Sequence, residues 1–299
     1  RGGGAGGGGG GGGWGGEGVA WGRARGPGGR QAGAELGAGT SEGDGGRRKR
    51  EWRGLNTRPG RDVEDILWWD GDRLLGFLGL YAFAPPTVEL AGMVHPAARR
   101  RGIATALLAA ALPLCRDRGH REALLVTPRE SSPGRSFALS RGAVLEHSEH
   151  ALVLLDAPTD GPTEPTVTVR TATHADASAV SGLLAAAFGG PPSEVRELPA
   201  TETSSTLVVE VAGSVIGTLR QSREDDQVAG IYGFSVDPAW QGRGIGRDVL
   251  RRVCRRLRDG GVHRIGLEVA VDNDHAMGLY TSLGFTPVTT EDYYALPSL

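Results

Sequence analysis

Cysteine and lysine are nearly absent from this chain of 299 residues. The two cysteines, Cys115 and Cys254, form no CxxC pair and show no metal-ligand spacing. Their scarcity argues against a disulfide-stabilised fold and a zinc site, and it makes the reducing cytoplasm the expected location. Lysine occurs once, at Lys49, so arginine carries almost all of the positive charge, a bias typical of GC-rich coding sequences. A cluster of arginines is therefore weak evidence for a function in this chain.

A net charge and a long apolar run are also missing. The 33 Lys and Arg residues nearly balance the 35 Asp and Glu residues, so no overall field attracts nucleic acid or an anionic membrane. The longest apolar stretch, residues 105–115, contains Pro113 and is far shorter than the ~20 residues of a membrane-spanning helix. No export leader is recognisable. These features predict a cytoplasmic protein that binds neither nucleic acid nor a membrane.

Glycine, in contrast, is concentrated near the N-terminus. Residues 1–50 contain 24 of the 50 glycines and few apolar positions. Such a segment cannot bury enough apolar surface to offset the loss of backbone entropy, so we expect residues 1–61 to be a disordered Gly/Arg-rich tail. Gly/Arg-rich tails can bind RNA, but the only aromatic residues among the first 50 are Trp14 and Trp21. A tail without a role in catalysis, or a misplaced gene start, is the preferred interpretation.

From residue 62 onward, short β-like runs alternate with amphipathic helices, which is the pattern of an α/β domain. The first unit, residues 62–156, has expected strands at residues 64–70, 73–81, 88–94, 123–127 and 144–155 and expected helices at residues 103–118 and 135–141. A proline-rich linker is expected at residues 157–165. The second unit, residues 166–299, has expected strands at residues 166–171, 205–211, 215–220, 228–236 and 264–271, expected helices at residues 176–188, 245–258 and 275–283, and one or two closing strands at residues 285–296.

An internal repeat relates the two units. A shift of 142 residues aligns residues 93–142 with residues 235–284 without a gap. The identical pairs include Gly102 with Gly244 and Gly142 with Gly284. We interpret the chain as a tandem duplication, with residues 62–156 as repeat one and residues 166–299 as repeat two.

A glycine-rich loop follows the expected strand 228–236. Gln241, Gly244 and Gly246 form the pattern Q-x-x-G-x-G directly before the expected helix 245–258. Glycines allow the backbone to approach an anion, and the free N–H groups and positive dipole end of a helix bind phosphate oxygens. The loop is not a Rossmann fingerprint, which would need glycine at Arg247, and the chain lacks the Gly-Lys-Ser/Thr of a P-loop. The pattern therefore predicts a diphosphate-binding site.

This motif resembles that of the GNAT superfamily of acyl-coenzyme A dependent N-acetyltransferases, in which Q/R-x-x-G-x-G/A binds the pyrophosphate of coenzyme A. Repeat one keeps the pattern as Arg99-x-x-Gly102-x-Ala104, and a second family signature of repeat two runs from Asn273 through Tyr280. The resemblance implies an α/β fold of two tandem GNAT-type domains, each a mixed, mostly antiparallel sheet flanked by helices. It also implies acetyl-CoA as co-substrate and no metal.

The resemblance assigns roles to residues of repeat two. Tyr280 corresponds to the acid that protonates the departing thiolate, and Asn273 to the residue that contacts the pantetheine arm. The expected acetyl-CoA-binding residues are Phe234, Ser235, Val236, Gln241, Gly242, Arg243, Gly244, Ile245, Gly246, Arg247 and Asn273. These residue types suit the reaction, because attack of an amine on a thioester creates an oxyanion that backbone N–H groups stabilise and a thiolate that needs a proton.

The group that removes the proton of the acceptor amine stays open. Related enzymes often carry a glutamate on the strand before the motif, where this chain has Gly230 or Ile231. Tyr232 or a chain of waters could serve instead, and Glu268 on the next expected strand is another candidate. Asp237 is better explained as a turn residue.

The expected helix 245–258 separates into an apolar face and an arginine face. The apolar face contains Ile245, Val249, Leu250, Val253 and Leu257, and the other contains Arg247, Arg251, Arg252, Arg255 and Arg258. A nucleic-acid surface is conceivable. Because of the arginine bias, we prefer a solvated basic face, with Arg247 near the phosphates of the coenzyme.

Repeat one departs from the family pattern at the positions that carry chemistry. Its counterpart of Tyr280 is Ala138, and its counterpart of Asn273 is Ser131. It also lacks a recognisable first strand and helices, because the sequence before residue 62 is the low-complexity tail. We expect repeat one to be a degenerate or truncated partner without catalytic activity, and repeat two to be the catalytic domain.

These inferences predict an enzyme that moves an acetyl group from acetyl-CoA to a primary amine of a small molecule or a peptide. The main alternative is the reaction of the mycothiol synthase-like two-repeat members, which this chain resembles in layout and which acetylate the cysteinyl amine of a thiol precursor. An alternative of another class is a non-catalytic acyl-CoA-binding sensor or scaffold, which the retained Tyr280 disfavours. We expect a monomer or a homodimer.

Overall fold

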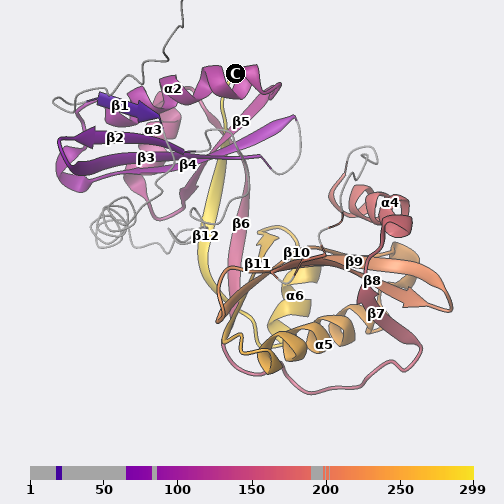
Figure 1. Cartoon of the computed structure of the whole chain (residues 1–299). Helices are drawn as coiled ribbons and strands as arrows, with labels where there is room; N and C mark the ends of the chain where they lie inside the picture. The colour runs from indigo at the N-terminus through magenta and orange to yellow at the C-terminus, as the bar shows by residue number, and fades with distance from the viewer. Residues whose placement is uncertain (1–17, 22–64, 83–85, 190–197, 199, 202) are drawn as a thin grey trace, which may run out of the picture.

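A computed structural model of the chain describes residues 18–21, 65–82, 86–189, 198, 200–201 and 203–299 (Figure 1). The expected disordered tail, residues 1–61, lies outside the described residues except for residues 18–21. Within the described ranges, no helix combines the length and the apolar character that a membrane crossing requires.

The described residues form one mixed sheet with the strand order β1-β2-β3-β4-β5-β12-β6-β11-β10-β9-β8-β7. The strands are β1 (Gly18–Trp21), β2 (Asp65–Asp70), β3 (Arg73–Tyr81), β4 (Thr87–Val94), β5 (Glu122–Pro128), β6 (Val144–Leu154), β7 (Val167–Thr171), β8 (Ser204–Val211), β9 (Ser214–Arg223), β10 (Val228–Val236), β11 (Arg264–Ala270) and β12 (Thr286–Ala295). Only β4 with β5 and β10 with β11 pair in parallel among these strands, which confirms the expected mixed, mostly antiparallel sheet.

The helices lie between these strands in the expected order. They are α2 (Ile103–Asp117), α3 (Ser132–Ser140), α4 (Ala177–Phe188), α5 (Ile245–Asp259) and α6 (Asp274–Ser282), with the short 3-10 helices η2 (Pro96–Ala98), η3 (His174–Asp176) and η4 (Pro238–Trp240). Every strand and helix expected from residue 62 onward is present, and its ends lie within three residues of the expected ones.

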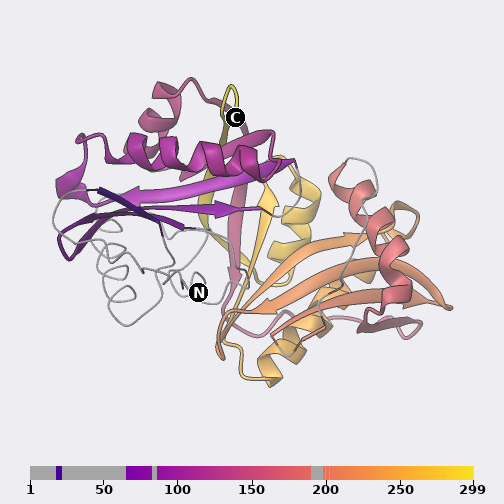
Figure 2. The ribbon, with the colours of Figure 1, turned by 45° about the horizontal axis from the view of Figure 1, so that its top comes forward.

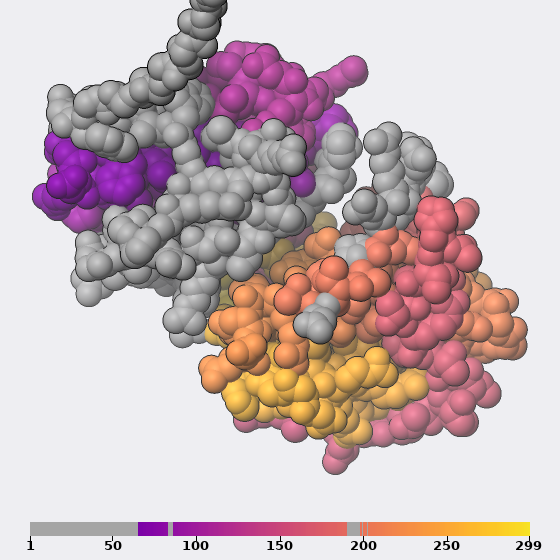
Figure 3. Space-filling view, viewed as in Figure 1, coloured from indigo at the N-terminus to yellow at the C-terminus, as the bar shows by residue number. Residues whose placement is uncertain are grey.

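The last strands of the two repeats change places. β6 of repeat one pairs antiparallel with β11 of repeat two, and β12 of repeat two pairs antiparallel with β5 of repeat one. The two strands also pair with each other, and Figure 2 shows them running between the halves. The halves form two lobes in the space-filling view (Figure 3). A division at residues 157–165 separates the repeats in sequence, but each half of the sheet contains a strand of the other repeat.

A buried carboxylate ties the exchanged strands together. Asp292 on β12 accepts a hydrogen bond from Ser148 Oγ of β6 at 2.8 Å and another from Arg129 Nε, next to β5, at 3.0 Å. The side chain of Asp292 is only 5% exposed, so these donors replace the water that it loses on folding. Three strands that come from both repeats therefore share one buried polar contact.

Strand β1 is not expected from the sequence. It pairs antiparallel with β2 at the end of the sheet, in the place that β7 takes beside β8 in the other half. The expectation that repeat one lacks a first strand is therefore wrong. The strand was not predicted because it has only four residues and lies inside a glycine-rich segment.

Helices cover both faces of the half that contains repeat two. α5 and α6 lie on one face and α4 on the other (Figure 1). The expected apolar face of α5 is confirmed, since all five of its residues are buried in one core with β10 and β11. Burying each such side chain contributes about 1.5–3 kcal/mol, so this core supplies much of the stability of the half.

The expected solvated arginine face of α5 is wrong at Arg251. This side chain is 3% exposed, and it donates to the carbonyl oxygens of Thr159 and Pro162, each at 2.9 Å. A Cβ atom at Gly161 would overlap the Arg251 guanidinium, so the linker needs glycine there. The helical pattern could not reveal this burial, because the linker, and not the helix, covers the side chain.

Other arginines of α5 bind the linker and the residues that flank it. Arg258 Nη1 donates to the carbonyl oxygen of Leu155 at 2.9 Å, Arg252 Nη1 donates to that of Val167 at 3.0 Å, and Arg255 forms an ion pair with Asp160. Helix α5 thus binds the linker between the repeats along its length, and the arginines of α5 have a structural role.

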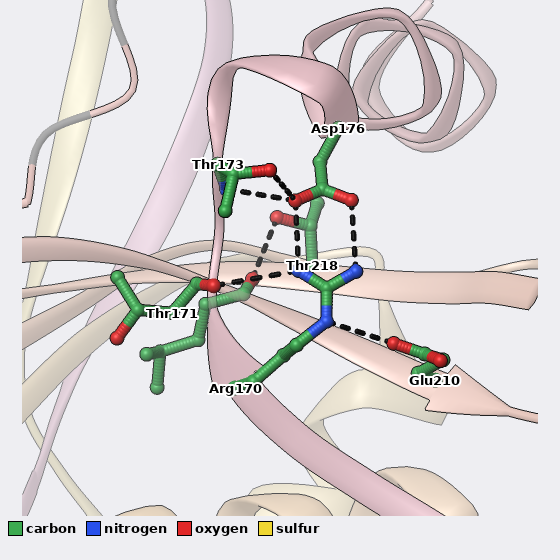
Figure 4. Close-up of polar contacts among 7 residues, drawn as sticks. Arg170, Thr171, Thr173, Asp176, Glu210 and Thr218 are labelled. Atoms are coloured by element: carbon green, nitrogen blue, oxygen red, sulfur yellow. Dashed lines mark hydrogen bonds and ion pairs between the residues drawn. The ribbon is translucent and has the colours of Figure 1, made fainter. Parts of the chain in front are cut away.

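A charged cluster fixes the start of α4 (Figure 4). Arg170 on β7 donates to both carboxylate oxygens of Asp176 at 2.8 and 2.9 Å and to Glu210 of β8 at 2.8 Å. Asp176 also accepts from the backbone N–H and the hydroxyl of Thr173. The hydrogen bonds from Arg170 and then Thr173 hold the pKa of Asp176 far below its usual value. The cluster anchors α4, which packs on β9 and β10.

Candidate active site

The motif loop of repeat two is held by contacts to the strand that precedes it. Asp237 accepts a hydrogen bond from the N–H of Ala239 at 2.8 Å and starts the short helix η4, as expected for a turn residue. Gln241 Nε2 donates to the carbonyl oxygen of Val236 at 2.8 Å. The first residue of the motif therefore fixes the loop against the end of β10.

The N-terminus of α5 is open. Gly244 is its N-cap residue, with φ of +82°, and no side chain caps the helix. Gly242 also has a positive φ, of +73°, and a Cβ at either glycine would meet no atom within 4 Å. The first N–H groups of a helix have no partner inside the helix, and its dipole is positive at this end. The loop thus presents donors to an open surface that suits an anion.

Gly246 lies against the core side of the same helix turn. A Cβ atom there would lie 3.5 Å from the ring of Phe234 and 3.6 Å from Leu279, which is ordinary van der Waals contact. Ile245 is buried, so only its backbone can contact a ligand. An alanine therefore fits at residue 246.

The two arginines of the loop make local contacts. Arg243 lies 4.8 Å from the ring centroid of Trp240 and donates to the carbonyl oxygen of Ala239 at 3.0 Å. Arg247 Nε donates to Ser282 Oγ of α6 at 2.8 Å and so links α5 to α6. Both side chains support the loop, and both stay next to its open surface.

β10 diverges from β11 on the way to this loop. The parallel pairing ends where Gly230 lies opposite Gly266, and residues 231–236 have no partner on that side among the described strands. A register shift against β9 occurs in the same stretch, around Gly233 with its φ of +57°. Ser235 Oγ is buried there without a hydrogen-bond partner in the described part of the chain. The gap leaves backbone and hydroxyl groups available to an extended polar ligand.

Asn273 lies at the N-terminus of α6 and caps it. Its Oδ1 accepts from the N–H of Ala276 at 3.0 Å. In repeat one, Ser131 Oγ accepts in the same way from the N–H of Gly134 at 3.2 Å. The capping contact is common to both repeats, so only the amide group of Asn273 distinguishes repeat two.

Tyr280 belongs to the core of repeat two. It is buried in α6, and its ring makes an edge contact with Phe285 at 6.0 Å between centroids. Burial raises the pKa of Tyr280 to about 12, so its hydroxyl stays protonated at neutral and moderately alkaline pH. The corresponding Ala138 of repeat one is also buried and carries no ionisable group.

A cavity of about 1150 Å³ extends between the two repeats. From repeat one its lining includes Val94, Arg99, Gly102, Ser131 and Ala138, and from repeat two it includes Gly230, Tyr232, Arg264, Gly266 and Glu268. On the sheet face opposite α5, it covers the last paired residues of β10 and β11, the rung of Gly230 and Gly266, and extends along both strands to either side of them. The pair Gly230–Gly266 is therefore open on two sides. The cavity reaches this pair from one face of the sheet, and the gap between β10 and β11 reaches it from the other.

The sequence-predicted residues fall into two groups around this rung. The first group lies on the side of the strand gap and of helices α5 and α6, and none of its members lines the cavity. It consists of residues 234–236 and 241–247, Asn273 and Tyr280. Tyr232 and Glu268, two of the proposed proton acceptors, do line the cavity. The sequence analysis did not identify Arg220, which lies 5.1 Å from the ring centroid of Tyr232. Glycines within the strand 228–236 are a signal of close backbone approach that could have pointed to this surface.

The described residues bring no three His, Cys, Asp or Glu side chains into an arrangement that could hold a metal ion.

Comparison with known proteins agrees with this geometry. The family model for the acetyltransferase (GNAT) family matches residues 39–140 and 180–285. Mycothiol acetyltransferase of Thermobispora bispora is 30% identical over 251 residues, which cover 77% of this chain and 82% of that protein. N-alpha-acetyltransferase RimI of Mycobacterium tuberculosis is 37% identical over 133 residues, which cover 42% of this chain and 82% of that protein.

A solved structure has the same two-part fold. The crystal structure of a GCN5-related N-acetyltransferase from Sphaerobacter thermophilus matches with a TM-score of 0.73 and 20% identity, covering 93% of this chain and 95% of that one. Both motif loops of this chain lie inside the matched residues of the family model. The chain therefore belongs to the acetyltransferase (GNAT) family and is an acyl-CoA-dependent N-acetyltransferase with two tandem repeats.

Proposed function

We propose that repeat two transfers the acetyl group of acetyl-CoA to a primary amine of a small-molecule or peptide acceptor. The observation that carries this proposal is the coincidence, in repeat two, of an uncapped helix N-terminus, an early strand gap and a tyrosine on α6. In repeat one the same register has Ala138 on α3. The catalytic unit is residues 166–299, completed by β6 of repeat one.

The residues of the gap and the loop fit acetyl-CoA. The open N–H groups at Gly244 and Gly246 suit the diphosphate, because both charge and donor geometry favour an anion there. The buried, unpartnered hydroxyl of Ser235 and the unpaired edge of β10 suit the amide groups of a pantetheine arm. The remaining predicted residues of the site border the same path for acetyl-CoA. They are residues 241–243 and 245, Arg247, Phe234, Val236 and Asn273.

Each step of the reaction then has a group in repeat two. Backbone N–H groups of residues 231–236 stabilise the oxyanion formed when the amine attacks the thioester. The protonated hydroxyl of Tyr280 gives its proton to the departing thiolate. The acceptor enters from the cavity, because the cavity reaches the paired rung from the other face of the sheet.

The test is an amine screen with acetyl-CoA in which the N-acetylated product is identified by mass spectrometry. The expected result is a product that needs both the enzyme and one class of primary amine. Acetyl-CoA binding without amine-dependent product across the screen would contradict the proposal and favour an acyl-CoA-binding sensor or scaffold.

A second candidate acceptor is the cysteinyl amine of a thiol precursor. The likeness to mycothiol acetyltransferases covers both repeats, whereas the likeness to RimI covers 42% of the chain. Gly230 stands where related enzymes carry a glutamate, so the proton acceptor would have to be another residue. The screen should include this amine beside simple amino sugars and a peptide N-terminus, and a preference of at least tenfold for it would select this candidate.

A further inference from the structure

Tyr232 lies on the cavity side of the last paired rung. Along β10, Gly230 and Tyr232 line the cavity, while Ile231 between them does not line it and is buried in the core with α5. Side chains alternate between the two faces of a strand, so Tyr232 and the cavity residues share one face. Tyr232 is the first residue on that face beyond the rung at which β10 and β11 separate.

The rung itself has no side chains. Gly230 lies opposite Gly266, and a Cβ at Gly266 would meet nothing closer than 3.9 Å. Two facing glycines therefore leave an open floor at the point where the strand gap begins. An acceptor amine that enters from the cavity can therefore approach this floor on its Gly266 side.

The hydroxyl of Tyr232 lies over this floor. A Cβ built at Gly230 would overlap the Tyr232 hydroxyl, so the phenol is folded back along its own strand. The glycine at residue 230 is needed to make this room. In consequence, the space that a side chain at residue 230 would fill holds a hydroxyl that belongs to residue 232.

A guanidinium lies against the ring of this phenol. Arg220 is the cross-strand neighbour of Tyr232 on β9, and its guanidinium carbon lies 5.1 Å from the ring centroid. A cation over an aromatic face is attracted to the negative face of the ring, so this contact helps to hold Tyr232 in place over Gly230. Glu268, two residues beyond the rung on β11, lines the same cavity.

We infer that Tyr232 is the catalytic residue that takes the proton from the acceptor amine. This inference rests on the proposed function. An acceptor that arrives as an ammonium ion loses two protons when its nitrogen becomes an amide. The first passes to the Tyr232 oxygen, while the Tyr232 hydroxyl proton moves on to Glu268 or to water. The nitrogen then bonds to the acetyl carbon, the carbon–sulfur bond breaks, and the second proton replaces the one that Tyr280 gives to sulfur.

Tyr232→Phe tests this inference, because it keeps the ring over Gly230 and removes only the hydroxyl. We expect kcat/KM to fall about 100-fold near neutral pH. The loss should shrink as pH rises, since more of the acceptor then arrives without its proton. The affinity for acetyl-CoA, measured by calorimetry, should stay within twofold of that of the unaltered enzyme. A merely structural tyrosine would give a loss that does not depend on pH.

Tyr294→Phe is the control. Tyr294 is buried in the core of the half that contains repeat one and is not among the residues that line the cavity. It should retain full activity. Glu268→Gln should cost less than Tyr232→Phe, because water can replace the carboxylate as the next proton carrier.

The outcomes separate the inference from the proposed function. Amine-dependent turnover that Tyr232→Phe leaves unchanged at every pH overturns the inference and leaves the function standing. An equal loss in Tyr294→Phe, or a larger loss in Glu268→Gln, also overturns it. If the unaltered enzyme acetylates no amine, the proposed function fails and the inference fails with it.

Discussion

The motif loops of the two repeats have nearly the same backbone although their residues differ. Arg100 of repeat one has φ of +65°, and Gly242 at the same place in repeat two has φ of +73°. The next motif glycine has φ of +82° in both loops, and neither following helix has a side-chain cap. A residue other than glycine in the left-handed region costs about 1–2 kcal/mol. Repeat one therefore keeps the loop conformation even where its sequence opposes it.

The strands behind the loops differ much more. In repeat one, β4 stays paired with β5 up to Ala91 opposite Val126, which leaves residues 92–94 beyond the last pair. In repeat two the last pair is at Gly230, which leaves residues 231–236 and includes the register shift. The gap of repeat two therefore opens three residues earlier in the aligned register. A duplicated loop can therefore persist in both copies while the strand gap is longer in one copy and the tyrosine on the following helix is present only there.

Tyr280→Phe addresses the largest difference between the repeats. Because the change removes a positioned acid and keeps the ring in its core, we expect the turnover rate to fall about 100- to 10,000-fold with acetyl-CoA affinity unchanged. Because the pKa of Tyr280 is about 12, we also expect that deprotonation of Tyr280 does not lower the rate below about pH 10.5. Steady-state rates with the best acceptor and calorimetry measure both. Tyr294→Phe, a buried tyrosine in the core of the other half, is the control. If both variants turn over at the same rate, Tyr280 is not the residue that makes repeat two the catalytic one.

Arg251→Met tests the binding of the linker to one repeat only. Repeat one has Ala109 at the aligned position, and no arginine of α2 takes the place of Arg251. Removing this buried guanidinium leaves two linker carbonyl oxygens without a donor and takes one of its two arginine partners from the buried Asp248, so we expect a loss of about 3 kcal/mol in the free energy of unfolding. Urea denaturation measures the loss. The exposed Arg256→Met on the same helix should change stability by less than about 0.5 kcal/mol, and similar values for the two variants would refute the contrast.

Asp176→Asn tests the charged cluster of β7 and α4. We expect a loss of about 1–2 kcal/mol at pH 7, a value reduced because the Arg170 side chain is 41% exposed. The folded state lowers the pKa of Asp176, so its stabilising contribution is complete above the unfolded value of about 4 and is lost as the pH falls below it. The stability difference between the two proteins should therefore be constant from pH 7 to 5 and narrow below pH 4. A constant difference down to pH 2 would show that ionisation of Asp176 is not its source.

Gly242→Ala measures the smallest difference, the strain in the two loops. A Cβ at Gly242 has open space around it, so only the left-handed backbone opposes the change, and we expect a loss of about 1 kcal/mol. The reciprocal Arg100→Gly should cost nothing in stability. A loss in Arg100→Gly equal to that in Gly242→Ala would mean that the Arg100 side chain holds its loop through contacts.

The local features of the fold were predictable because they depend on neighbouring residues. The alternation of small and apolar residues predicted strand 228–236 with both of its ends correct. The spacing of Val249, Val253 and Leu257 predicted the buried face of α5. The glycines at 242 and 244 predicted an open helix N-terminus. Periods of two and 3.6 residues carry this information without reference to distant parts of the chain.

The distant pairings were not predictable in this way. The patterns of residues 144–155 and 285–296 indicate strands, but they do not specify which neighbours these strands have, so the exchange of β6 and β12 was missed. The burial of Arg251 depends on a linker that follows no period. The cavity needs surfaces from both repeats, and for this reason the sequence identified Tyr232 only as one option among several.

The central claim is that repeat two performs the reaction, and a matched pair of loop variants tests it most directly. Gly246→Asp and Ala104→Asp place the same negative charge at the same position of the two motifs. An acid in the first turn of a helix is favourable for the helix but repels a diphosphate, so both variants should fold. We predict that Gly246→Asp lowers acetyl-CoA-dependent turnover at least 100-fold, that Ala104→Asp leaves it within twofold of the unaltered enzyme, and that the control Gly246→Ala does the same. Loss of turnover in Ala104→Asp with activity retained in Gly246→Asp would contradict the account and assign catalysis to repeat one.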